Sequence, residues 1–420
     1  MTDTPLMVSM VFAALLVVTT LTQLGLLVRQ TRHVATHRDQ VPAAFVGTVS
    51  VPEHQKAADY TLAKTRIATV EILLQAAVLM AWTLMGGLNW LNQALMPLLG
   101  VGMGQQLALV AAFALVSMLI DLPLSAYRTF RLEARFGFNR TRPRDWLVDL
   151  LKGLVVSAVV GLPLIALLLA LMNHATQGWW LWAWASLMGF NLLLMVLFPT
   201  VIAPLFNTFA PLSDDQLVQR VSALMARCGF KAKGIFVMDG SRRSAHGNAY
   251  FTGLGHAKRV VFYDTLLALL TPDEVEAVLA HELGHFHHKH LIRRLLTMAA
   301  VTFAGFALLA WLSDQTAFYT GLGVTPNPLG NNHGLALLLA MLGLPLLGFF
   351  ASPFWASQSR RDEFEADRFA GTHAKASALA SALLKLHQDN ASTLTPDPWY
   401  VWFHYSHPPA ASRLKRLQTA

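Results

Sequence analysis

The segment 277–296 concentrates residues that can bind a metal ion. It carries five histidines, and the first two frame the sequence His281-Glu282-Leu283-Gly284-His285, which matches the metal-binding pattern H-E-x-x-H. On an α-helix, residues four apart lie about 40° apart around the axis and about 6 Å along it, so both imidazoles can bind one ion. Glu282 lies about 100° round the same helix and can reach a water molecule on that ion.

The chemistry that this pattern favours is metal-assisted hydrolysis. Neutral imidazoles suit Zn²⁺, and a catalytic zinc keeps one position open for water. The ion lowers the pKa of that water to about 7, and a neighbouring carboxylate removes its proton during attack on a carbonyl. The pattern also arises by chance, but here it lies on a capped helix after a predicted hairpin. We therefore expect one Zn²⁺ per chain, bound by His281 and His285, with Glu282 as the general base.

The other histidines of the segment fit the same ion poorly. His288 shares a face with His281 and His285 but lies about 10.5 Å from His281 along the axis, so it cannot share an ion with both. His285 and His288 could pair, but no glutamate then lies correctly between them. We expect a polar collar at the start of the next membrane span, formed by His287, His290, Lys289, Arg293 and Arg294.

A third ligand must come from elsewhere in the chain, and the segment 357–371 offers four carboxylates on one predicted helix. Glu363 and Asp367 share a face, because they are four residues apart. We expect Glu363 on the metal and Asp367 hydrogen-bonded to a ligating imidazole, which fixes the tautomer of that ring. Glu365 faces the opposite way. The alternative is a solvated charged face, paired with Arg360, Arg361 and Arg368.

The elements that position these residues belong to a membrane protein. The 420 residues are 54% hydrophobic and only 13% charged, with a mean hydropathy of +0.45. Apolar stretches long enough to cross a bilayer occur seven times. They are residues 6–28, 67–90, 107–127, 153–172, 179–198, 295–312 and 334–352. Glycine in the second span and proline in the third predict a break or bend there.

The distribution of Lys and Arg predicts the orientation. The loops after the first, third and fifth spans and the tail after the seventh are basic, whereas the N-terminus and the other loops carry no Lys or Arg. The N-terminus is therefore expected outside and the C-terminus in the cytoplasm. Basic loops facing anionic lipids explain the pI of about 9.7, so nucleic-acid binding is not expected. The single cysteine, Cys228, excludes an intramolecular disulfide and a thiolate metal cluster.

We expect an all-α membrane region, residues 1–205 and 295–353, with a cytoplasmic α+β zincin-like catalytic domain. That domain is assembled from residues 206–294 and 354–420. Its first segment reads as a helix capped at Ser213 and Asp214, a short strand within 233–241 that ends in an Asp-Gly turn, a hairpin around Gly253–Gly255, and the histidine helix. Thr271 is the expected N-cap of that helix, and Pro272 is its first residue.

Five segments together resemble the type I CAAX prenyl endopeptidases, which are seven-span membrane zinc metalloproteases. The segments are FPTVIAPLFN at 198–207, SRRSAHGNAYFTG at 241–253, AHELGHF at 280–286, SRRDEFEADRFA at 359–370 and YSHPPAASRL at 405–414. They cover the second half of the chain, and the span count fits the first half. The resemblance implies that His281, His285 and Glu363 bind zinc, that Glu282 activates water and that Asp367 orients His281.

The resemblance also implies how a substrate binds. Asn248 and Ala249 are expected on an edge strand that pairs with the backbone of a peptide. His407 is similar to a residue near the metal that could stabilise an oxyanion, and Arg413 matches a basic residue beside the same site. The seven helices are expected to surround a chamber. Glu71 and Asp121 are candidates to line it, and snorkelling to the membrane surface is the alternative.

The expected substrate is a peptide or protein, with or without a prenyl group, and membrane lipids are expected partners. The Leu-, Ala- and Arg-rich composition is more typical of bacteria, which favours a bacterial inner membrane and other membrane-associated peptides. An HtpX-like quality-control protease is the first alternative, although such enzymes are shorter. The second alternative is a seven-helix transporter or receptor with a structural metal site, but such a protein has no use for Glu282 as an acid-base group.

Overall fold

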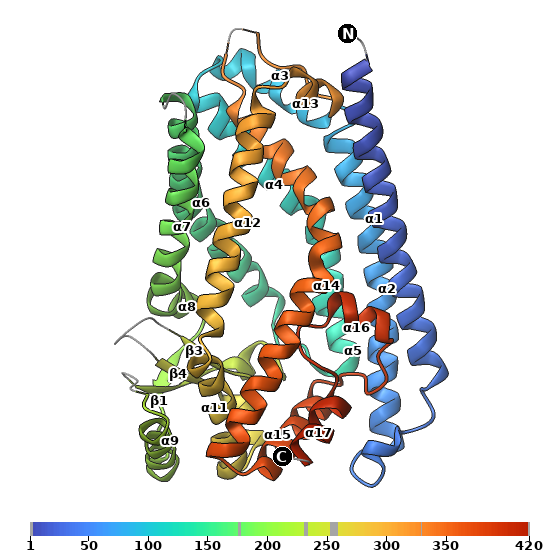
Figure 1. Ribbon diagram of the computed structural model, residues 1–420, viewed down its shortest axis with the longest axis vertical. Coiled ribbons are helices and arrows are strands. Elements are labelled where there is room, and N and C mark those ends of the chain that lie inside the picture. Colours follow the sequence, from blue (N-terminus) through green and yellow to red (C-terminus); the bar gives the residue numbers. More distant parts are fainter. Residues whose placement is uncertain (1–2, 175–177, 231–233, 253–258, 329, 419–420) are drawn as a thin grey trace.

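The computed structural model describes residues 3–174, 178–230, 234–252, 259–328 and 330–418. Long helices run along the molecule, and a small sheet with shorter helices lies at one end (Figure 1). Within the described residues, seven helices are long and apolar enough to cross a membrane, which confirms the expected number. They are α1 (Asp3–Thr36), α2 (Val51–Trp82), α4 (Met103–Tyr127), α6 (Pro143–His174), α7 (Trp179–Leu197), α12 (His290–Ser313) and α14 (His333–His373).

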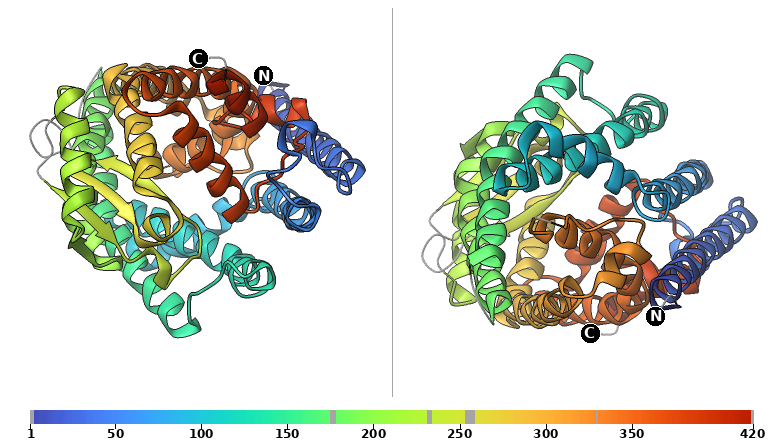
Figure 2. Two further views of the ribbon diagram at one scale, coloured as in Figure 1. Left: turned by 90° about the horizontal axis from the view of Figure 1, so that it is seen from below. Right: turned by 90° about the horizontal axis from the view of Figure 1, so that it is seen from above.

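Most of the membrane helices bury little of their apolar surface within the protein. In the first six spans only 6–28% of the most apolar stretch is buried within the protein, against 44% in α14. The axial views show the helices arranged around the long axis (Figure 2). Helices of a solid bundle would each bury a broad apolar face against their neighbours. Most of the apolar surface of these six stretches is therefore not buried within the protein, which fits helices that contact lipid.

The second span ends earlier than expected. Helix α2 stops at Trp82, and a turn leads into α3 (Gly87–Leu99), so residues 67–90 do not form one helix. Gly86 has a φ of 77°, and a Cβ on Gly87 would lie 2.6 Å from the carbonyl oxygen of Ala81. Glycine permits both the turn and the close approach. The third span instead continues through Pro123 into a π-helical turn, Arg128–Glu133, followed by α5 (Ala134–Phe136).

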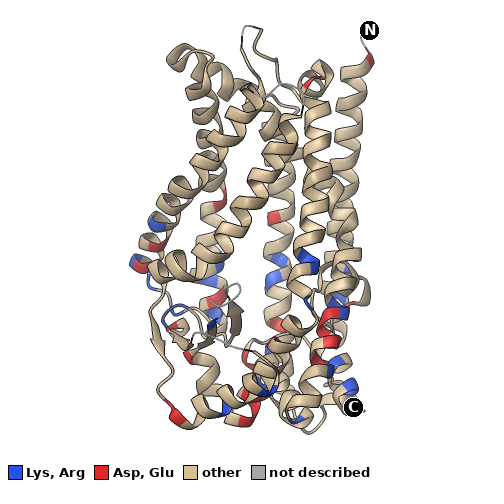
Figure 3. Cartoon of the chain, turned by 60° about the vertical axis from the view of Figure 1, so that its left-hand side comes forward, with Lys and Arg blue, Asp and Glu red and all other residues tan. Residues whose placement is uncertain are grey.

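The end of the molecule opposite the sheet is closed by α3 and α13 (Thr316–Gly321) (Figure 1). Asn92 donates a hydrogen bond of 2.9 Å to Asn327, and Gln105 donates one of 2.7 Å to Asn92. All three side chains are buried. Lys and Arg gather at the other end, around the sheet (Figure 3).

The sheet has four strands in the order β1-β2-β4-β3. Strand β1 (Phe209–Pro211) pairs antiparallel with β2 (Ile235–Met238), β2 pairs parallel with β4 (Arg259–Tyr263), and β3 (Ala249–Thr252) pairs antiparallel with β4. The predicted β3–β4 hairpin is therefore present, although its turn at Gly253–Gly255 lies outside the described residues. Because β3 pairs on one side only, its other side is an edge.

Helices from both sequence segments pack on this sheet. The first segment supplies α8 (Ala203–Phe206), which precedes β1, then α9 (Asp215–Arg227), α10 (Asp264–Leu269) and α11 (Pro272–His287). The second supplies the end of α14, α15 (Ala376–Asp389), α16 (Pro398–His404) and α17 (Ala410–Gln418). One apolar core joins both, from Val221 and Phe262 to Phe369 and Leu379. The expected boundary at 353/354 falls inside α14, which carries the chain unbroken from the membrane to the core.

Candidate metal centre

Helix α11 presents the two histidines of the H-E-x-x-H sequence on one face. Thr271 caps the helix by accepting a hydrogen bond from the N–H of Glu274, whose carboxylate accepts one from the N–H of Thr271. This capping box confirms the expected start of the helix. The Nε2 atoms of His281 and His285 lie 3.2 Å apart.

Helix α14 brings Glu363 to the same point. Its Oε2 lies 3.4 Å from Nε2 of His281, and its Oε1 lies 3.3 Å from Nε2 of His285. A Cβ on Gly284 would lie only 2.9 Å from Cα of Ala366 on α14. The absence of a side chain at Gly284 therefore allows the two helices close enough for the three groups to converge.

The three groups fit a metal ion. Two bonds of about 2.0–2.1 Å to one ion at a tetrahedral angle place imidazole nitrogens about 3.3 Å apart, close to the separation found here. Oε2 of Glu363 is buried and receives no hydrogen bond from the described residues. Nη1 of Arg413 lies 3.5 Å from this oxygen, so a metal ion at bonding distance would be a closer cationic partner for it.

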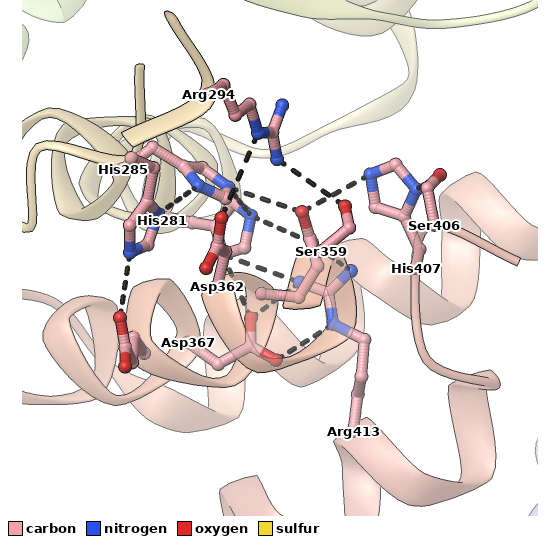
Figure 4. Close-up of polar contacts among 12 residues, drawn as sticks. His281, His285, Arg294, Ser359, Asp362, Asp367, Ser406, His407 and Arg413 are labelled. Carbon is pink, nitrogen blue, oxygen red and sulfur yellow. Dashed lines mark hydrogen bonds and ion pairs between the residues drawn. The ribbon is translucent and has the colours of Figure 1, made fainter. Parts of the chain in front are cut away.

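The outer nitrogen of His281 is held by two further residues. Its Nδ1 lies 2.9 Å from Oδ1 of Asp367, and Arg413 donates to the same carboxylate from Nε at 2.8 Å and from Nη2 at 2.5 Å (Figure 4). Burial alone would lower the pKa of His281, but Asp367 and Glu363 raise it to about 9. Burial likewise opposes the charge of Arg413, whose pKa the Asp367 carboxylate nevertheless raises. In this arrangement Nδ1–H of His281 donates to Asp367, which leaves Nε2 free for a metal.

The outer nitrogen of His285 meets His290, which sequence reasoning missed. The two Nδ1 atoms are 2.8 Å apart, and Nε2 of His290 lies 2.8 Å from Oε2 of Glu365. His290 is 1% exposed and contacts His285, so it supports a metal ligand instead of belonging to the expected polar collar. A continuous helix would place residue 290 about 140° round from His285. Instead α11 ends, Lys289 adopts a φ of 57°, and α12 starts in a new direction.

Glu282 lies between two cavities. One, of 260 Å³, is also lined by Asn248, Ala249 and His281; the other, of 320 Å³, is also lined by Phe251 and His281. Burial raises the pKa of Glu282, and the two histidines oppose that rise. A carboxylate whose pKa is shifted towards neutrality can take up and return a proton. Because β3 contributes residues to both cavities, its edge runs past the converging groups.

His407 reaches the same place from the loop after α16. Its Nε2 lies 3.4 Å from Oε1 of Glu363, and its Nδ1 lies 2.9 Å from the hydroxyl of Ser406 (Figure 4). The side chain is 66% exposed to the cavities, yet desolvation by their walls lowers its pKa. The lowered pKa favours the neutral ring. Glu71 and Asp121 were the two residues expected to line a chamber between the membrane helices. Glu71 forms an ion pair with Arg128, and Asp121 is exposed.

The sequence matches two family models along almost its whole length. Residues 30–208 match a model described as CAAX prenyl protease N-terminal, five membrane helices, and residues 211–420 match Peptidase family M48. The chain is 31% identical over 406 residues to CAAX prenyl protease 1 homolog of Oryza sativa, covering 93% of this chain and 92% of the relative. It is 34% identical over 325 residues to CAAX prenyl protease 1 of Saccharomyces cerevisiae, covering 74% and 72%.

A solved structure supports the same relationship. The crystal structure of Ste24p from S. mikatae matches with a TM-score of 0.91 at 29% identity, covering 98% of each chain. Neither the HtpX-like alternative nor a transporter or receptor is favoured by matches of this kind. The chain belongs to the CAAX prenyl protease 1 family and is an integral-membrane metalloprotease.

Proposed function

We propose that the metal is zinc and that one ion is bound by His281, His285 and Glu363. The observation that carries this proposal is the convergence of two Nε2 atoms and one carboxylate within 3.4 Å of one another. Two nitrogen ligands and one oxygen ligand leave a fourth position open, as catalytic zinc sites do. Bound zinc supplies Lewis acidity, which polarises a peptide carbonyl and makes a water molecule acidic enough to attack it.

Four residues of the chain carry out the other steps of catalysis or support them. Glu282 removes a proton from the attacking water and returns it to the leaving amine. Asp367, held by Arg413, fixes the ring of His281. His407 lies 3.4 Å from Glu363, where a neutral ring can donate a hydrogen bond to the developing oxyanion. Arg413 lines the cavity beside Glu282 and adds positive charge on the substrate side.

The substrate is an extended peptide paired with the free edge of β3. Asn248 and Ala249 line one of the two cavities and Phe251 lines the other, which supports a peptide that crosses the metal ligands between them. Peptides of many sequences can pair with an edge strand, because the hydrogen bonds involve only the peptide backbone and not its side chains. Prenylated C-terminal CAAX peptides are the substrates that the names of the relatives favour, and other membrane-associated peptides fit the same edge.

The orientation that we propose places the catalytic domain, residues 206–294 and 354–420, in the cytoplasm and the N-terminus outside. Lys and Arg at the sheet end of the molecule support it (Figure 3). The same basic residues can contact anionic lipids. A bacterial inner membrane is the location that the composition favours.

Replacing Glu282 with Gln tests the proposed mechanism. The amide cannot take a proton from water, so cleavage of a fluorogenic CAAX peptide should fall by at least about 1,000-fold while one zinc per chain remains bound. Asp273→Asn on the outer surface of the same helix is the matched control and should cleave normally. Wild-type activity in Glu282→Gln would contradict the mechanism, and wild-type protein without zinc would contradict the site.

A further inference from the structure

A polar cluster at the junction of the membrane helices and the catalytic domain takes no part in the mechanism above. Tyr60 on α2 donates a hydrogen bond of 2.7 Å to Glu133 in the π-helical turn. The other carboxylate oxygen of Glu133 lies 3.9 Å from Nε2 of His246. Nδ1 of His246 lies 2.7 Å from Oδ1 of Asn390 at the end of α15. The cluster thus connects two membrane spans to one residue from each sequence segment of the catalytic domain.

Asn390 is the member of this cluster that reaches the active site. It lines the 260 Å³ cavity together with Asn248 and Glu282, and it also lines an adjoining cavity of 450 Å³ behind His407. Its amide oxygen is engaged by His246. Among the described residues, no acceptor is hydrogen-bonded to the amide nitrogen of Asn390. This N–H group can therefore donate to a carbonyl of a bound peptide.

The orientation of the Asn390 amide follows from its neighbours. The Glu133 carboxylate lies on the Nε2 side of the ring and raises the pKa of His246, and Nδ1 is the nitrogen that faces Asn390. Nδ1–H then donates to Oδ1 of Asn390, so the NH₂ group is the part left for the cavity. The ring of His246 is also stacked on Phe138, with centroids 4.5 Å apart.

The backbone beside Asn390 is held in an unusual conformation. Ala391 has a φ of 42°, a region that residues other than glycine seldom adopt, and it is 3% exposed. It is packed in a small apolar cluster with Tyr60, Leu132 and Phe138. This left-handed turn ends α15, with the N–H of Ser392 donating to the carbonyl of His387, and residues of the membrane helices pack against it.

We propose that Asn390 is a further substrate-binding residue, whose amide N–H donates to a backbone carbonyl of the bound peptide, and that His246 and Glu133 are positioning residues for it. A peptide paired with β3 through one edge leaves carbonyls on its other edge, and Asn390 lines the same cavity from α15. This inference rests on the proposed function, since it requires a peptide bound along β3.

The decisive variant is Asn390→Asp. An aspartate keeps the contact with His246 but has no N–H to donate, so kcat/KM for a CAAX peptide should fall about tenfold, mainly through KM, with zinc content unchanged. Asn390→Gln retains the donor and should recover part of the loss. Gln388→Ala on the same helix removes an amide that contacts Thr48 outside both cavities, and it should cleave normally.

A second set of variants tests the positioning residues. His246→Gln and Glu133→Gln should each raise KM with little change in kcat, and neither should add to the loss caused by Asn390→Asp. Wild-type kcat/KM in Asn390→Asp, or additive losses in the double variants, would overturn the inference. If Asn390→Asp does not fold, wild-type KM in both His246→Gln and Glu133→Gln overturns it. If the Asn390, His246 and Glu133 variants all behave like wild type but Glu282→Gln loses activity, this inference fails and the proposed function stands.

Discussion

The two histidines of the metal centre are supported by different groups. On the His281 side, Asp367 contacts the ring directly, and Arg413 holds that carboxylate with two hydrogen bonds. On the His285 side, the contact is a second imidazole, His290, and the carboxylate of Glu365 lies one step further out. Asp367 and Arg413 are buried, whereas 39% of the Glu365 side chain is exposed. The His281 side is therefore the more rigid support, and the His285 side is the more adaptable one.

The largest difference should follow from removing Asp367. Asp367→Ala frees the ring of His281 and leaves Arg413 paired only with the ligand Glu363, so zinc affinity should fall about 100-fold. Competition against a chromophoric chelator measures the change. An affinity within a factor of two of wild type would show that Asp367 does not support the ligand.

Removing His290 should have a smaller effect. His290→Ala removes a buried partner and frees the ring of His285. The His285 side chain is 19% exposed against 9% for His281, so water can replace that partner and zinc affinity should fall only about tenfold. The same chelator competition applies, with His287→Ala as an exposed control. A loss equal to that of Asp367→Ala would remove the distinction between the two sides.

The smallest effect should come from the start of the shared helix. Thr271→Ala removes the cap of α11, which carries both histidines, and should lower the free energy of unfolding by about 1 kcal/mol. Zinc affinity should stay unchanged, because the cap lies far along the helix from the ligands. Thermal unfolding in detergent gives the first quantity, and a change in zinc affinity would show that helix fraying reaches the metal.

The difference between the two sides also explains what the sequence could predict. His281, His285, Glu363 and Asp367 follow from helical periodicity, because each pair lies four residues apart on one uninterrupted helix. His290 does not follow, because the chain turns at Lys289 and the periodicity ends there. The break in the second span was predicted from its glycines, whereas its position after Trp82 depends on how Gly87 approaches Ala81.

Other site residues depend on contacts between distant segments. Arg413 and His407 were found only through the family resemblance, since no spacing relates them to α11. Asn390 was not found at all. Its orientation depends on Tyr60 and Phe138, which lie more than 250 positions away in the sequence and reach it only in the folded chain.

The central claim is that α11 and α14 together build one zinc site, and two glutamates on α14 test it most directly. Zinc content and peptide cleavage should be measured side by side for Glu363→Gln and Glu365→Gln. Glu363→Gln should lose the bound zinc and nearly all cleavage, because it removes a ligand, whereas Glu365→Gln should keep one zinc per chain and most of its activity. Full zinc and normal cleavage in Glu363→Gln would contradict the account.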